Sequence, residues 1–117
     1  RNIDIIGFLP PYASQIYDKM KNMGNKYQYL FELEPALTDI FKKYSFKFYD
    51  FSNSQSFGSG DQEMLDGSHG SEKAMLKLYL KLLEKNPILE NYSDQNFLLA
   101  KLKNAKDNDI IFKDEIY

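Results

Sequence analysis

Cysteine is absent from this chain of 117 residues, and arginine occurs only once, at Arg1. Without cysteine the chain has no disulfide bond and no thiolate metal site, and an oxidising compartment is permitted but not required. With a single arginine, bidentate recognition of phosphate or carboxylate groups is nearly excluded. No apolar run approaches the ~20 residues that a membrane-spanning helix needs. We therefore expect no transmembrane segment in this chain.

The charge balance is close to neutral, with a formal net charge of -2 and a pI of about 5.4. No basic stripe of the kind that binds nucleic acid is present, so we expect no nucleic-acid partner. Hydrophobic residues make up 43% of the chain and aromatic residues 15%, which is ample for a packed core. The chain is thus one folded domain or part of one, and not a disordered tail.

The spacing of apolar residues predicts strands and helices in alternation. Strands are expected at 3–9 and 46–51. Helices are expected at 13–23, 35–44, 70–85 and 93–104. The order of these elements indicates an α/β protein with a parallel sheet.

Individual residues refine these boundaries. Pro35 fits the first turn of the second helix, where its missing N–H costs nothing. Ser93 or Asp94 is expected to cap the last helix. The tail 109–116 has the pattern of a short third strand.

So few strands leave the edges of a parallel sheet unpaired. Either a second chain completes the sheet, a homo-oligomer included, or the N-terminal half of the domain lies outside this sequence. The sequence opens with Arg1, without a methionine or a visible signal peptide. We therefore expect it to be a segment of a longer protein.

The only histidine, His69, lies three residues after Asp66 in a loop rich in glycine and serine. A histidine acts as a general base when its second ring nitrogen donates a hydrogen bond to a carboxylate. Gly67, between the two, is expected to let the backbone turn sharply. The loop follows a strand, and open α/β sheets bind ligands beyond the carboxyl ends of their strands. The pattern predicts an acid–base pair.

Two other interpretations fit the same loop. Aspartate, glycine and serine before a helix also make an ordinary turn and cap, with Ser71 in the capping position. Asp61 and Glu63 could join Asp66 and His69 as metal ligands. That spacing matches neither an EF-hand nor an H-E-x-x-H pattern, so we expect no metal and no cofactor.

Three residues that follow the two strands are candidates for substrate contacts. Asn53 offers hydrogen bonds to a polar substrate, and Pro11 and Tyr12 could form a rim beside the site.

The chain has, in order, an apolar strand ending at proline, a helix, an aromatic strand ending at aspartate, a glycine-rich loop, the motif D-G-x-H and an amphipathic helix. This order resembles the C-terminal half of the SGNH (GDSL-like) hydrolase superfamily. It looks closest to the branch of envelope acyltransferases, which includes alginate-type O-acetylation proteins and D-alanine transfer proteins of teichoic acid. In that superfamily D-x-x-H precedes the final helix. The resemblance therefore implies that Asp66 is the acid and His69 the base of a catalytic triad.

The resemblance covers about residues 3–86, and it implies a partial three-layer α/β/α sheet of the flavodoxin-like kind. Residues 1–86 are accordingly expected to be the C-terminal part of such a domain, and residues 87–117 a helical extension with a short tail. The nucleophilic serine of the superfamily lies in an upstream G-D-S-like block, which this sequence lacks. We expect the chain to hold the acid and base without the nucleophile, and to be inactive alone.

The implied function is that of a serine esterase or O-acyltransferase acting on an acylated, and by expectation acetylated, carbohydrate. The implied location is the periplasm or cell envelope of a bacterium. The alternative is a small non-catalytic α/β domain that binds a partner or a glycan, in which the D-G-S-H turn serves only as a cap.

Overall fold

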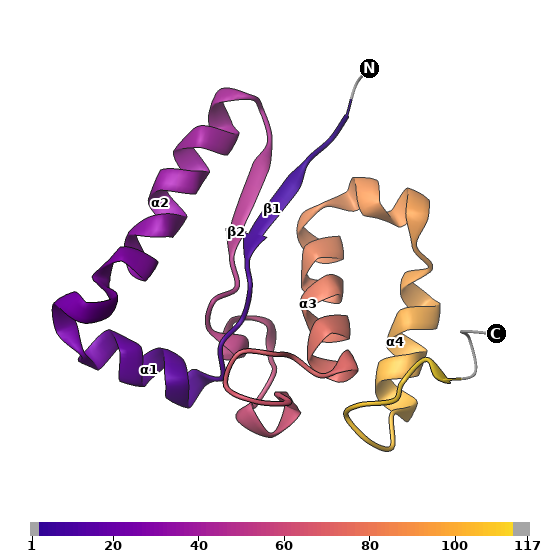
Figure 1. Cartoon of the computed structure of the whole chain (residues 1–117). Helices are drawn as coiled ribbons and strands as arrows, with labels where there is room; N and C mark the ends of the chain where they lie inside the picture. Colours follow the sequence, from indigo (N-terminus) through magenta and orange to yellow (C-terminus); the bar gives the residue numbers. More distant parts are fainter. Residues whose placement is uncertain (1–2, 114–117) are drawn as a thin grey trace.

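The computed structural model describes residues 3–113 and shows a mixed α/β fold (Figure 1). Strands β1 (Ile6–Leu9) and β2 (Lys47–Asp50) form a parallel pair, and this is the sheet of the described residues. Helices α1 (Ser14–Asn22) and α2 (Gln28–Lys43) connect the two strands, and α3 (Glu72–Lys85) and α4 (Gln95–Asn104) follow them. The predicted α/β class and the parallel pairing are confirmed.

Alternate residues of the two strands contact different helices. Helices α2 and α3 lie on opposite sides of the strands in Figure 1. On one face the Phe41 ring of α2 packs on Phe48, with ring centroids 5.0 Å apart, and closes over Gly7. The other face packs on α3. The buried core of that face consists of Phe51, Phe57, Leu78 and Leu82.

Gly7 has the tightest surroundings in the sheet. A Cβ atom there would lie 2.6 Å from the Phe41 ring and 2.7 Å from the Phe48 ring. We predict that Gly7→Ala lowers the free energy of unfolding by about 1–3 kcal/mol, because the rings have to move. Denaturant unfolding measures this. On a Phe41→Leu background the cost of Gly7→Ala should shrink, and an equal cost on both backgrounds would contradict the clash.

Helix α2 starts at Gln28, well before the predicted position 35, so Pro35 lies inside the helix and the predicted boundary is wrong. A proline inside a helix removes a hydrogen bond and crowds the preceding turn. The earlier turns form nonetheless because they pack on α1, where the rings of Tyr17 and Phe31 meet edge to face at 5.3 Å. Tertiary packing outweighs the local penalty here.

The last helix begins as predicted, with Asp94 as its cap, because the Asp94 carboxylate accepts a hydrogen bond from Phe97 N. The predicted strand at 109–116 is wrong for residues 109–113, and 114–116 lie outside the described residues. Instead, this segment returns to the start of α3, where Glu72 Oε2 accepts hydrogen bonds from the backbone N–H groups of Ile111 and Phe112. Between residues 3 and 113, no helix is both long and apolar enough to cross a membrane.

Candidate functional site

Asp66 and His69 are in direct contact in the loop between β2 and α3. The Nδ1 atom of His69 lies 2.7 Å from Oδ2 of Asp66. The other oxygen, Oδ1, accepts hydrogen bonds from the backbone N–H groups of Ser68 at 2.7 Å and His69 at 2.8 Å. One carboxylate oxygen therefore fixes the turn, while the other orients the imidazole ring.

This contact determines what the ring can do. With Nδ1 facing a carboxylate, the neutral imidazole carries its proton on Nδ1 and leaves Nε2 as the acceptor. The side chain of His69 is 74% exposed and that of Asp66 is 56% exposed. No hydrogen bond joins Nε2 to any of residues 3–113. The free nitrogen is thus available to take a proton from a bound group.

The Asp66 carboxylate is held in its charged form. The backbone N–H of Ser68, followed by the side chain and backbone N–H of His69, keeps the pKa of Asp66 well below its ordinary value. A carboxylate that stays ionised can stabilise an imidazolium as it forms.

The lowered pKa of Asp66 leads to a titration experiment. A depressed carboxyl pKa stabilises the folded loop above the pH at which an unfolded aspartate titrates, about 3.9, and this stabilisation is lost as the pH falls towards the lower folded value. We predict a carboxyl ¹³C midpoint for Asp66 below that of a free aspartate, and a higher one in His69→Ala. The midpoint should stay depressed in the variant because both backbone donors remain. An unchanged midpoint in His69→Ala would show that the ring does not bind the carboxylate.

A short antiparallel stem carries the pair. Leu65 N donates to His69 O at 2.8 Å, Met64 and Gly70 form an antiparallel bridge, and Ser71 N donates to Glu63 O at 3.1 Å. Ser71 also caps α3, since its hydroxyl accepts a hydrogen bond from Ala74 N. The predicted cap is thereby confirmed, and it is Ser71, not Asp66, that fills this role.

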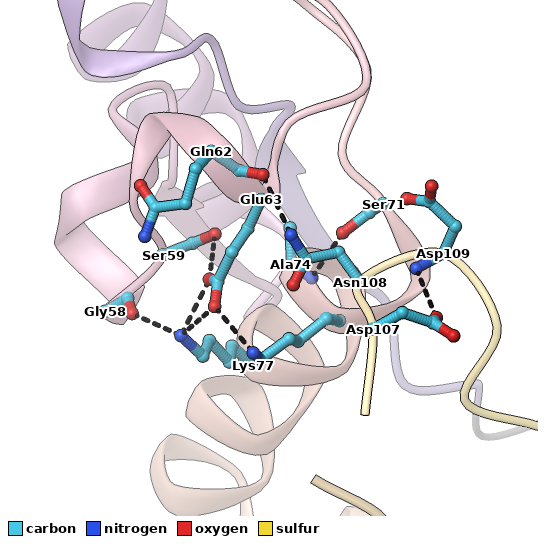
Figure 2. A network of polar contacts seen from close by, with 11 residues as sticks. Gly58, Ser59, Gln62, Glu63, Ser71, Ala74, Lys77, Asp107, Asn108 and Asp109 are labelled. Atoms are coloured by element: carbon cyan, nitrogen blue, oxygen red, sulfur yellow. Dashed lines mark hydrogen bonds and ion pairs between the residues drawn. The ribbon is translucent and has the colours of Figure 1, made fainter. Parts of the chain in front are cut away.

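The Glu63 side chain at the base of the stem is 5% exposed and binds both α3 and the preceding loop (Figure 2). It accepts hydrogen bonds from Lys77 Nζ at 2.7 and 2.8 Å and from the Ser59 hydroxyl at 2.8 Å, and Lys73 Nζ lies 3.3 Å away. Burial acts to raise the pKa of Glu63, but the donors, led by Lys77 and Ser59, outweigh it, so this pKa lies below its ordinary value. The side chains of Lys73 and Lys77 are only partly exposed, at 25% and 22%.

Glu63→Gln tests this anchor. The variant removes the buried charge that pairs with Lys77, so we predict a loss of about 1–3 kcal/mol in unfolding free energy. We also expect faster amide hydrogen exchange at Leu65 and Ser71, whose N–H groups bond within the stem. Glu84→Gln is the matched control because Glu84 pairs with Lys81 at the surface and is 63% exposed. Equal effects of the two variants would contradict a special role for Glu63.

Gly67 joins this loop to the start of α1. Its carbonyl accepts a hydrogen bond from Ala13 N at 3.0 Å, and a Cβ atom on it would lie 3.0 Å from Ile16 Cγ1. The backbone bends at Gly67 as expected, but its φ is not positive, unlike those of Gly24 and Gly58, so the turn itself does not require glycine. Glycine serves here because α1 passes close to the loop.

Asp61 has a role that sequence reasoning missed. Its carboxylate accepts hydrogen bonds from the backbone N–H and hydroxyl of Ser14 and from Gln15 N, and so caps α1 from 47 residues away. These bonds offset burial and lower the pKa of Asp61. The alternative set of metal ligands is therefore dispersed, and residues 3–113 contain no cluster of three or more such side chains that could hold a metal ion.

The predicted substrate contacts gather beyond the strand ends. Tyr12 and Asn53 form a parallel bridge that continues the pairing of β1 and β2. The Asn53 side-chain oxygen accepts a hydrogen bond from Gln55 N, which occupies it locally. Pro11 is buried, while Tyr12 is partly exposed. Tyr12 and Asn53 thus lie near the Asp66–His69 loop, because Ala13, which follows Tyr12, donates its N–H to Gly67 O in that loop.

No protein-family model, curated protein or solved structure matches the chain. Its function is therefore argued from the geometry of its own residues, together with the resemblance of its motif.

Proposed function

We propose that Asp66 and His69 are the acid and base of a Ser-His-Asp esterase or O-acyltransferase of the SGNH kind. On this proposal the chain is the C-terminal part of a three-layer, flavodoxin-like domain that acts on an acylated carbohydrate such as an acetyl ester. The observation that carries the proposal is the 2.7 Å contact between His69 Nδ1 and Asp66, with Nε2 left without a hydrogen bond to the described residues. The cellular location, a bacterial periplasm or envelope, rests on the resemblance alone.

The proposed chemistry follows from the orientation of the ring. A serine hydroxyl supplied from outside these residues attacks the ester carbonyl, and Nε2 of His69 accepts its proton. Asp66 stabilises the resulting imidazolium through Nδ1. The imidazolium then protonates the leaving alcohol, and the acyl group remains on the serine. Water or a sugar hydroxyl then attacks the acyl-serine and gives its proton to His69. The bond between the acyl carbon and the serine oxygen breaks, and the imidazolium returns the proton to the serine oxygen.

The unpaired edges of the sheet support the proposal that the serine comes from outside the described residues. β1 and β2 pair only with each other within residues 3–113, and a parallel sheet this small is not stable alone. Ile3 and Ile5, just before β1, are 63% and 44% exposed. A further strand beside β1 would cover such residues and bring its own loop to the same end of the sheet as His69.

The proposal is tested by ester hydrolysis with the full-length natural polypeptide that contains these residues. His69→Ala should lower kcat on an acetylated sugar by at least about 10³-fold, because the serine then lacks its base. Asp66→Asn should also lower kcat. Asp39→Asn, which changes an exposed aspartate on α2, is the matched control and should keep the wild-type rate. Wild-type activity in His69→Ala would overturn the proposal and favour the non-catalytic interaction domain.

A further inference from the structure

An apolar cavity lies between α1, α2 and the carboxyl end of β1. Its volume is about 140 Å³. The lining side chains are mainly aliphatic or aromatic, and they include Leu9, Tyr12, Tyr17, Met20, Phe31 and Leu33. Apolar cavities of about 150 Å³ in proteins bind molecules as large as benzene. The cavity therefore has room for a hydrocarbon group of about six carbon atoms.

Polar groups gather at one side of this cavity. Ser52 contributes to its lining, and its backbone N–H and hydroxyl both donate hydrogen bonds to Asp50. Burial, then the negative charge of Asp50, raise the pKa of Tyr17, while a hydrogen bond with Ser52 acts to lower it. The Asp50 carboxylate thus stands close to a cavity wall. An anionic ligand would be repelled there, whereas a neutral one would not.

The same backbone carries the cavity wall and the Asp66–His69 loop. Tyr12 lines the cavity and donates its N–H to Ser52 O at 2.8 Å. The next residue, Ala13, donates its N–H to Gly67 O, between Asp66 and His69. The cavity and the acid–base pair are therefore joined through one short stretch of chain at the end of the sheet.

We propose that this cavity binds the aliphatic acyl chain of a neutral ester, up to about six carbon atoms long. The acyl part of an esterified sugar fits this lining, because sugar hydroxyls would be left without hydrogen-bond partners in an apolar cavity. The inference rests on the proposed function for its link to an ester, and it extends the acyl group beyond acetyl. The binding itself does not depend on catalysis.

Binding of methyl esters to the full-length natural polypeptide that contains these residues tests the inference directly. We expect methyl butanoate, pentanoate and hexanoate to bind with affinity that rises about fourfold per added methylene. The rise should stop beyond about six carbons, where the cavity is full. Hexanoate anion should bind more weakly than methyl hexanoate because of Asp50. Amide chemical shifts of Tyr17 and Phe31 report the binding, and an affinity independent of chain length would overturn the proposal.

A pair of methionines on the first helical segment offers a matched comparison. Met20 lines the cavity, whereas Met23, at the end of α1, does not and is 42% exposed. Met20→Trp fills the cavity and should weaken methyl hexanoate binding by about tenfold or more, equivalent to losing two buried methylenes. Met23→Trp should leave the affinity unchanged. Equal weakening by both variants would contradict binding in this cavity. If Met20→Trp does not fold, the chain-length dependence of binding to the wild type tests the proposal.

His69→Ala separates this inference from the proposed function. The variant should bind methyl hexanoate as the wild type does, because His69 is not part of the cavity lining. Chain-length-dependent binding together with wild-type hydrolysis in His69→Ala would defeat the proposed function alone. Hydrolysis that needs His69 but is indifferent to acyl length and to Met20→Trp would defeat the cavity proposal alone.

Discussion

The position of the Asp66–His69 loop depends on one buried carboxylate, that of Glu63. Its bonds to Lys77 and Ser59 tie the base of the stem to α3 and to the preceding loop. The backbone hydrogen bonds between residues 63–65 and 69–71 then hold the tip of the loop in place relative to Glu63. The exposed side chains of Asp66 and His69 are thus positioned by a contact elsewhere, that of Glu63. This contact is strong because water is largely excluded around it.

Local sequence signals were sufficient for the features that depend on nearby residues. Asp66 and His69 are three positions apart, and a single turn with two backbone hydrogen bonds brings them together. The caps at Ser71 and Asp94 also act within three residues. The parallel pairing of β1 and β2 followed from the order of the elements, because a helical connection between two strands favours that arrangement.

Features that depend on distant residues were missed. Asp61 caps a helix 47 positions away, and no local pattern marks it as a cap. Lys73 and Lys77 lie four residues apart on α3 and both pair with Glu63 from the preceding loop, which no local pattern indicates. Helix α2 continues through Pro35, and before this proline Phe31 packs on Tyr17. The presence of a proline in the sequence gives no indication of that contact. In each case tertiary packing decided against the local preference.

Solvent exposure bears on the chemistry of the pair as much as its geometry does. An ion pair between side chains that are 74% and 56% exposed is weakened by water. Covering the loop would strengthen the contact by lowering the local dielectric, and would also remove water that competes for Nε2. On the proposed function, a segment that brings a serine to His69 would also cover this surface. Assembly of the triad and activation of its base would then be one event, because the same contact supplies the nucleophile and excludes the solvent.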